Sequence, residues 1–284
     1  MALRGSTRGD GAPPNEIEIL RSRPWENYVR PIKMGPHIYS VSGNDWLAIY
    51  LIDTGDGLVM IDTGFFEDIY LVLANMNFLG LKLRDVKHIF LTHGHGDHWG
   101  GLRAMKELTG ARVYMPREDY DFFFVQHPES GNPMREEGFI MAPFQPDEFY
   151  SDNKPIAIGR MRFRTKLCPG HTVGTTAFFF DDTEEETGKT YHVGLHGGIG
   201  ISSMSAKRLA EFNLPVSLRR RFMDDLLELK KLDIDICLPG HSTQIGLVKM
   251  MEEMKDDMDY SVFVDKTIWP ELMEQRWNLA NELE

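Results

Sequence analysis

Three histidines and one aspartate lie within six residues in the stretch Leu91-Thr92-His93-Gly94-His95-Gly96-Asp97-His98. The apolar residues 86–91 before the loop predict a buried strand, and a helical pattern follows over residues 99–109. Imidazole and carboxylate groups suit zinc, manganese or iron, and the glycines let the backbone turn tightly around an ion. The loop can therefore supply ligands to two metal ions, although it cannot complete either coordination shell alone.

Two histidines further along the chain end turns that match each other. His171 ends the run Cys168-Pro169-Gly170-His171, and His241 ends the run Leu238-Pro239-Gly240-His241, each after a predicted strand. Because the turns match, both histidines are candidates for the ligands that the loop lacks. Together, five histidines and Asp97 suffice for two metal sites. Four other histidines lack this context and are interpreted as structural: His37, His88, His127 and His192.

These motifs together resemble a known family. The run over residues 92–101, Thr-His-Gly-His-Gly-Asp-His-Trp-Gly-Gly, resembles the His-x-His-x-Asp-His signature of the metallo-β-lactamase-fold hydrolases. Other stretches resemble further motifs in the family's order over residues 36–245: Leu51-Ile52-Asp53-Thr54, Met60-Ile61-Asp62-Thr63-Gly64, Pro169-Gly170-His171-Thr172-Val173-Gly174 and Pro239-Gly240-His241. The resemblance implies an α/β (α+β) fold, a four-layer αβ/βα sandwich with the metal site at one edge between two sheets.

The resemblance also implies roles for the candidate residues. It gives each metal its own ligands: His93, His95 and His171 for the first, and Asp97, His98 and His241 for the second. Asp97 would also orient the attacking water or accept its proton, which makes it the expected catalytic residue. Asp62 would orient a ligand histidine. The other interpretation of Asp62 is an aspartate that caps the turn before Thr63.

One position departs from the family pattern. Many members with two metals carry a bridging aspartate in a Gly-Asp context, whereas this chain has His196 near that place and no aspartate in residues 192–198. Three interpretations of His196 stay open: an unusual ligand, a substrate contact, or an ordinary loop histidine. The third subclass of metallo-β-lactamases, which the chain somewhat resembles, also lacks this aspartate. Two zinc ions are therefore expected, with iron or manganese as alternatives.

The expected activity is metal-dependent hydrolysis. Two divalent ions lower the pKa of a shared water to near 7, and the hydroxide would attack an ester, thioester, lactone or lactam bond of a small molecule. A β-lactamase proper is one version, and a glutathione-thioester hydrolase, weakened by the missing aspartate, is another. The alternatives are a mononuclear-iron sulfur dioxygenase on the same fold and a binding protein without catalysis, which the complete ligand set disfavours.

The chain is expected to form one domain behind an N-terminal arm. Residues 1–15 are small and polar and predict a flexible arm, and residues 16–284 predict a single domain whose halves meet near residue 154. Residues 120–150 combine aromatics with four prolines, which predicts an insertion or lid with little regular structure. Periodicity predicts strands at 37–41, 46–54, 57–61, 86–91, 111–115, 160–165, 175–181, 190–193 and 234–238, and helices at 65–77, 99–109, 215–229 and in the tail, 247–284.

Composition argues against several other classes of protein. The 284 residues carry a formal net charge of −12, and an acidic surface disfavours nucleic-acid partners. No stretch approaches the roughly 18 apolar residues that span a bilayer, and no secretion signal is evident, so a cytoplasmic enzyme without membrane contact is expected. The cysteines, Cys168 and Cys237, are expected to be buried free thiols. A monomer or a homodimer is expected, with a small molecule as substrate.

Overall fold

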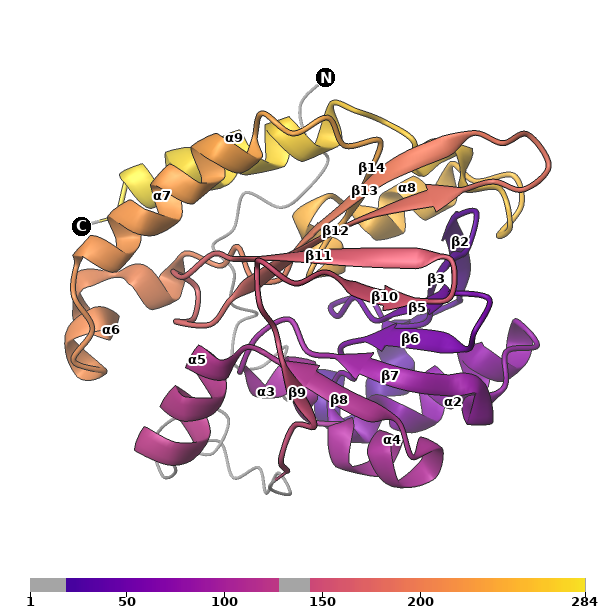
Figure 1. Cartoon of the computed structure of the whole chain (residues 1–284), viewed down its shortest axis with the longest axis horizontal. Coiled ribbons are helices and arrows are strands. Elements are labelled where there is room, and N and C mark those ends of the chain that lie inside the picture. The colour runs from indigo at the N-terminus through magenta and orange to yellow at the C-terminus, as the bar shows by residue number, and fades with distance from the viewer. Residues whose placement is uncertain (1–18, 128–143, 284) are drawn as a thin grey trace.

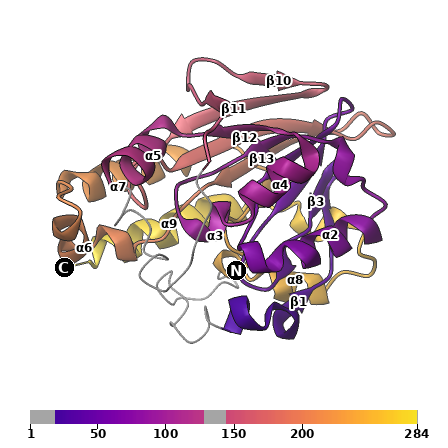
Figure 2. The same ribbon diagram turned by 90° about the horizontal axis from the view of Figure 1, so that it is seen from below.

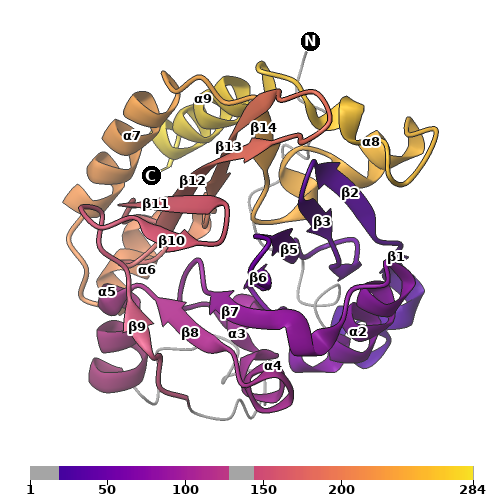
Figure 3. The ribbon, with the colours of Figure 1, turned by 45° about the vertical axis from the view of Figure 1, so that its right-hand side comes forward.

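Two β-sheets form the centre of the computed structural model, which describes residues 19–127 and 144–283. Helices cover the outer face of each sheet (Figure 3), so the layers run helix, sheet, sheet, helix. This arrangement confirms the four-layer α/β sandwich expected from the sequence.

The first sheet contains the strands predicted at residues 37–41, 46–54 and 57–61, which form an antiparallel meander. Its seven strands have the order β2 (Ile32–Gly35), β3 (Ile38–Ser40), β5 (Tyr50–Asp53), β6 (Leu58–Ile61), β7 (Val86–Phe90), β8 (Arg112–Met115) and β9 (Glu148–Phe149). β3, β5 and β6 pair antiparallel, whereas β6 to β9 pair parallel. Because parallel strands end at the same edge of a sheet, the loops after β6, β7 and β8 lie at one edge.

The second sheet contains the strands predicted at residues 175–181 and 190–193, which pair as a hairpin. Its five strands have the order β10 (Ile156–Ile158), β11 (Met161–Leu167), β12 (Thr176–Thr183), β13 (Thr190–His196) and β14 (Ile236–Leu238). All pairings are antiparallel except that of β13 with β14. A separate short ladder joins β1 (Tyr28–Val29) to β4 (Gly43–Asn44).

The longer helices lie on the outer sides of the sheets. α7 (Ser217–Leu229) and α9 (Ile268–Asn281) lie together outside the second sheet (Figure 1). α2 (Ile69–Phe78) and α4 (Leu102–Thr109) lie in front of the strands in the view from below (Figure 2). The shorter α-helices are α3 (Gly96–Trp99), α5 (Arg117–Tyr120), α6 (Ala206–Glu211) and α8 (Leu247–Glu252). Short 3₁₀-helical turns lie at Pro24–Asn27, Phe66–Asp68, Leu83–Asp85, Ser202–Met204, Ser242–Gln244 and Tyr260–Phe263.

Two hydrophobic clusters hold these layers together. The larger lies between the sheets and under α7 and α9, and in it Phe90 of β7 contacts Phe163 of β11. The smaller lies between the first sheet and the helices α2 and α4. Alternate residues of β6 belong to the two clusters, and all four are buried. The central strands therefore read as continuous apolar runs, because both of their faces are covered.

The expectation of little regular structure over residues 120–150 is wrong for the part that the structure describes. α5 continues into a π-helical turn, Asp121–Gln126, and β9 pairs with β8 at the sheet edge. Phe122 and Phe123 in this turn are buried, so the aromatic residues anchor a helical segment to the scaffold. Residues 128–143 and the predicted arm at 1–15 lie outside the described residues.

The helix predicted at residues 99–109 is divided into α3 and α4. The N–H of Gly101 donates a hydrogen bond to the carbonyl oxygen of Gly64 at 2.9 Å. A Cβ on Gly101 would lie 2.5 Å from the carbonyl oxygen of Thr63. The loop after β6 therefore packs directly against the segment that carries the histidine-rich loop, and this close approach requires glycine.

Three further observations concern single features of the chain. Gly110 ends α4 in the left-handed conformation, with φ of 68°. Cys168 and Cys237 are free and buried, as expected. Within residues 19–127 and 144–283, no helix is long and apolar enough to cross a lipid bilayer.

We predict that Tyr50→Phe destabilises the fold by about 1–3 kcal/mol. The fully buried Tyr50 of β5 donates a hydrogen bond to the Pro239 carbonyl at 2.7 Å, which links the first sheet to the turn before His241. Denaturant unfolding measures the change in the free energy of unfolding. The matched control is Tyr70→Phe, since Tyr70 is 49% exposed, and equal stability of the two variants would contradict the prediction.

Candidate metal centre

Three histidine side chains converge on one point at the edge between the sheets. His93 and His95 follow β7 and His171 follows β11, so the two sheets each contribute. His95 Nδ1 lies 3.1 Å from His93 Nε2 and 2.9 Å from His171 Nε2, and the two Nε2 atoms are 3.2 Å apart. A tetrahedral zinc ion with Zn–N bonds of about 2.0–2.1 Å separates its ligand nitrogens by about 3.3 Å. The triangle formed by these three nitrogens thus has about the size of one face of a tetrahedral coordination shell. We call these three residues the first group.

The partners behind these rings direct nitrogen lone pairs into the first group. The Thr92 hydroxyl donates to Asp62, so it can accept the Nδ1 proton of His93 at 3.0 Å. The Gly200 carbonyl accepts from His171 Nδ1 at 3.1 Å. Both rings therefore carry their proton on the outer nitrogen and present an unprotonated Nε2 to the centre. This tautomer is the one that a metal ligand needs.

Burial keeps the imidazoles of His93 and His95 neutral. It lowers the pKa of His93 and of His95 well below the ordinary value, and the neighbouring imidazoles lower both further. Neutral imidazole is the metal-binding form, so protons compete weakly for these nitrogens. The geometry and the charge state both fit a bound transition-metal ion.

Asp97, His98 and His241 form a second group beside the first. His98 Nε2 lies 3.2 Å from His241 Nε2, and Asp97 Oδ2 lies 3.7 and 3.5 Å from these two atoms. Asp97 and His98 belong to α3, whereas His241 follows β14. The rings of His93 and His98 are only 4.0 Å apart between centroids, so the two groups adjoin. Two adjoining sets of ligand atoms are the arrangement that a two-metal centre needs.

The charges in the second group are arranged around the Asp97 carboxylate. Burial would raise the pKa of Asp97, but the neighbouring His98 and His241 imidazoles lower it to about 2. Burial lowers the pKa of His241 to about 3. For His98, burial is outweighed by the Asp97 and Asp62 carboxylates, which raise its pKa. The carboxylate is therefore ionised at neutral pH and remains 17% exposed.

Asp62 contacts the metal loop from behind. Its carboxylate accepts hydrogen bonds from the Thr92 N–H and hydroxyl, each at 2.8 Å, and lies 2.7 Å from His98 Nδ1. Its φ of 58° is unusual for a residue other than glycine. These contacts favour the interpretation of Asp62 as the residue that orients a ligand histidine.

His196 lies outside both groups of ligand atoms. Its side chain is 2% exposed, and its Nδ1 accepts a hydrogen bond from the Gly198 N–H at 3.3 Å. Its Nε2 has no hydrogen-bond partner among the described residues. Burial, assisted by His171 and Lys166, lowers its pKa to about 3. Of the three interpretations, this placement favours the ordinary histidine, although His196 ends strand β13 and does not lie in a loop.

The four histidines interpreted as structural also lie away from the two groups. His37 contacts Asp182 at 2.7 Å, and His192 contacts Asp181 at 2.7 Å. The other two contact aromatic rings, His88 against Tyr114 and His127 against Phe122.

Sequence reasoning missed two residues that border the centre. Trp46 packs its ring edge-on against His241, with centroids 4.9 Å apart. Asp119 is fully buried and bonded to the loops of the first group. The run Arg117-Glu118-Asp119 reads as an acidic helix start, so its sequence carries no signal of burial. For Trp46, the only signal was an aromatic residue at the start of the strand predicted at residues 46–54.

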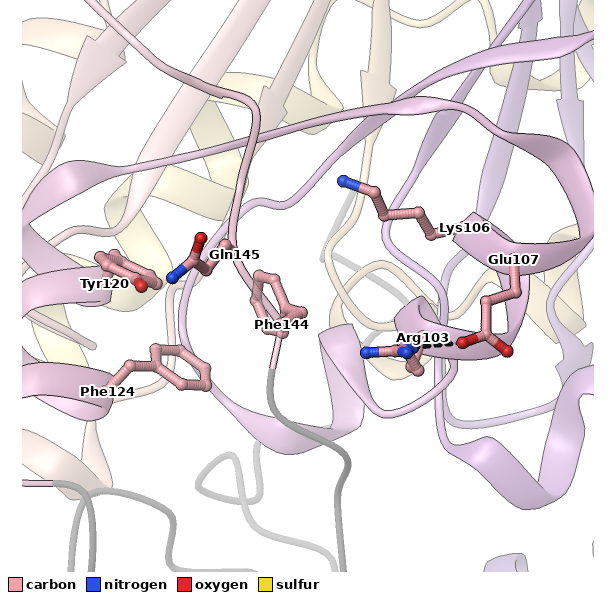
Figure 4. A pocket seen from close by; sticks show the side chains of 7 residues that line it. All are labelled: Arg103, Lys106, Glu107, Tyr120, Phe124, Phe144 and Gln145. Atoms are coloured by element: carbon pink, nitrogen blue, oxygen red, sulfur yellow. Dashed lines mark hydrogen bonds and ion pairs between the residues drawn. The ribbon is translucent and has the colours of Figure 1, made fainter.

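The pocket in Figure 4 holds none of the candidate ligands. Its volume is about 720 Å³, and it is lined by Arg103, Lys106, Glu107, Tyr120, Phe124, Phe144 and Gln145. Arg103 is paired with Glu107, and Lys106 with Asp147. Because both cations are already paired, we assign no ligand to this pocket. Two of its walls, Phe124 and Phe144, pack on the ring of Trp99 at the end of α3.

We predict that His196 makes the zinc-free protein acid-sensitive. The unfolded histidine has a pKa of about 6.5, and the folded one has a pKa of about 3. Below about pH 6.5 the unfolded chain binds a proton that the folded chain does not, so stability falls as the pH drops towards 3. Between about pH 6.5 and 4.5, wild type should lose about 2 kcal/mol more than His196→Asn, measured by denaturant unfolding. The control His192→Asn removes a half-exposed histidine. Identical pH dependence in wild type and His196→Asn would refute the prediction.

Comparisons with known proteins place the chain in a family. A family model described as the metallo-beta-lactamase superfamily matches residues 48–202, more than half of the chain. A hydroxyacylglutathione hydrolase of Shewanella pealeana is 29% identical over 145 residues, which cover 50% of this chain and 41% of that protein. The match thus spans about two fifths of that relative's length.

Solved structures match over nearly the whole chain. The metallo-beta-lactamase GOB-18 from Elizabethkingia meningoseptica has a TM-score of 0.79 at 25% identity, with 99% of this chain and 97% of that chain covered. The class B3 di-zinc metallo-beta-lactamase LRA-12 from an Alaskan soil metagenome has a TM-score of 0.77 at 21% identity, with 97% and 99% covered, and shares the fold. The chain belongs to the metallo-beta-lactamase superfamily.

Proposed function

We propose that this protein is a zinc-dependent hydrolase that cleaves an ester, thioester, lactone or lactam bond of a small molecule with two metal ions. The observation that carries the proposal is the convergence of two adjoining groups of three ligand atoms at one edge of the sandwich. Membership of the superfamily supports the same reaction class. His93, His95 and His171 would hold one ion, and the second group would hold the other.

The residues around the two groups suit the activation of water. Zinc held there would lower the pKa of a water molecule to near 7 and polarise the bond that is broken. Asp97 is ionised at neutral pH and partly exposed, so it can accept a hydrogen bond from the attacking water and orient it. Asp62 keeps the His98 proton on Nδ1 and leaves Nε2 free for the centre.

The second group supports the proposal of two ions. A protein with a single iron needs only one set of ligands, whereas this chain brings a complete second set within contact of the first. The absent bridging aspartate does not weaken the second group, because each group already has three ligand atoms. We therefore favour a two-zinc hydrolase over a mononuclear-iron sulfur dioxygenase.

The first substrate class to test is the β-lactam. The structural likeness to GOB-18 extends over 99% of this chain, and the sequence likeness to the hydroxyacylglutathione hydrolase covers half of it. A glutathione thioester is the second class. The net charge of −12 supports a small-molecule substrate rather than a nucleic acid. The cytoplasmic location, the lack of membrane contact and the monomeric or homodimeric state stay predictions.

We predict that the reconstituted protein holds two zinc ions per chain and that His93→Ala removes one of them. The variant takes one of three nitrogens from the first group, which leaves an incomplete shell. Elemental analysis after gel filtration measures the zinc content. The control is His192→Ala, a half-exposed histidine bonded to Asp181. A folded wild-type protein that binds no zinc would overturn the proposed function.

We predict that the zinc-loaded protein hydrolyses at least one member of a panel of β-lactam, thioester, lactone and ester substrates. Asp97→Asn should lower kcat by about 100-fold or more, because the carboxylate would bind the second metal ion and also orient the attacking water. The control is Asp233→Asn at an exposed ion pair with Lys266. Oxygen uptake with a persulfide, without hydrolysis of any panel member, would favour the dioxygenase and contradict the hydrolase.

A further inference from the structure

We propose that Asp119 is a positioning residue for the first metal group. Its carboxylate joins the His93-Gly94-His95 loop to the turn that follows His171, and so sets the spacing of the three nitrogens. The inference rests on the proposed function only in that the first group binds a metal. It adds a residue that lies outside every motif on which the family resemblance stands.

The carboxylate of Asp119 binds both ligand-bearing segments at short distances. Asp119 lies in α5, directly after β8, and its side chain is fully buried. Its Oδ2 accepts hydrogen bonds from the Gly94 N–H at 2.6 Å and from the Thr172 hydroxyl at 2.7 Å. Its Oδ1 accepts from the Gly174 N–H at 2.6 Å. Gly94 stands between two candidate ligands, and Thr172 stands next to the third.

The arrangement of donors requires a carboxylate at this position. The Thr172 N–H donates to the hydroxyl oxygen of Thr175 at 3.0 Å, and the Thr175 hydroxyl can donate to that of Thr172 at 2.8 Å. The Thr172 proton is then free to point at Asp119, whose three partners are all donors. An asparagine would turn one acceptor into an NH₂ group that faces an N–H or O–H donor. The buried site offers no room to avoid that contact.

Close packing on both sides holds the carboxylate in place. A Cβ on Gly174 would lie 2.6 Å from Asp119 Cγ, and a Cβ on Gly94 would lie 2.3 Å from the ring of Phe123. On the other side of Gly94, its carbonyl oxygen accepts a hydrogen bond from Trp99 Nε1 at 3.0 Å. Both peptide groups between His93 and His95 are therefore fixed by side chains.

Asp119 acts on one group only, which separates a positioning role from a general structural one. The loop comes from the first sheet and the turn at His171 comes from the second, and Asp119 bonds to both. The second group has a different partner, since His98 is oriented by Asp62. Loss of a residue that orients metal ligands typically lowers metal affinity 10- to 100-fold. Loss of Asp119 should therefore weaken one zinc site and spare the other.

The experiment compares the two zinc affinities in three variants of the full chain. Asp119→Asn removes one acceptor, Thr172→Val removes one donor, and Glu118→Gln removes an exposed charge from the same helix as a matched control. Competition with a chromophoric chelator gives both affinities, and His93→Ala identifies which of them belongs to the first group. Absorption spectra of the cobalt-substituted proteins report the ligand geometry without any substrate.

We expect Asp119→Asn to lower zinc affinity at the first group by about 10- to 100-fold and to change the other by less than about threefold. Thr172→Val should act in the same direction with a smaller loss, and Glu118→Gln should match wild type. Wild-type affinities in Asp119→Asn, or an equal loss at both sites, would overturn the inference. If Asp119→Asn does not fold, the ratio of the two zinc affinities in Thr172→Val tests the inference in its place. A wild-type protein that binds no zinc would instead refute the proposed function.

Discussion

Two imidazoles of the first group, those of His93 and His171, point their Nε2 lone pairs at one another across 3.2 Å. The three ligand nitrogens of the first group lie 2.9–3.2 Å apart, and burial lowers the pKa of His93 and of His95, so neither ring takes up a second proton near neutral pH. Lone pairs at such distances repel one another in the absence of a cation. The scaffold must therefore hold each ring from behind, and much of the structure near this edge serves that purpose.

Strand direction explains how both sheets deliver side chains to the same place. In the first sheet, Asp62 follows β6, the histidine-rich loop follows β7 and Asp119 follows shortly after β8, and these three strands are parallel neighbours. In the second sheet, β11, β13 and β14 run in one direction, because β12 lies antiparallel between β11 and β13. His171 and His241 follow two of these strands, and His196 ends the third. The candidate functional residues therefore lie where parallel strands end, as ligand sites do in other α/β folds.

The sequence predicts the ligands well because their signal is local. The loop at residues 93–98 and the two Pro-Gly-His turns can each be read within a few residues, and the structure places their six side chains in two adjoining groups. Asp119 could not be predicted in this way, since its partners Gly94 and Thr172 are distant in sequence and only the packing of α5 buries it. The short strand β9 could not be predicted for the same reason, because its partners in β8 lie more than thirty residues away in the sequence.

Electrostatic balance links the proposed metal ions to the folding of this edge. Asp62, Asp97 and Asp119 place three carboxylates around rings that are neutral when they bind a metal, and buried charges are costly unless they are compensated. Without compensation, burial raises the pKa of Asp119 to about 7, even though three hydrogen bonds oppose the shift. Two divalent cations would bring four positive charges against the three negative ones, so the site would come close to neutrality. The carboxylates therefore favour the metal-bound state by their charge as well as by their hydrogen-bond geometry. An uncharged amide of the same shape would lack the negative charge and would also lack one of the two acceptor oxygens.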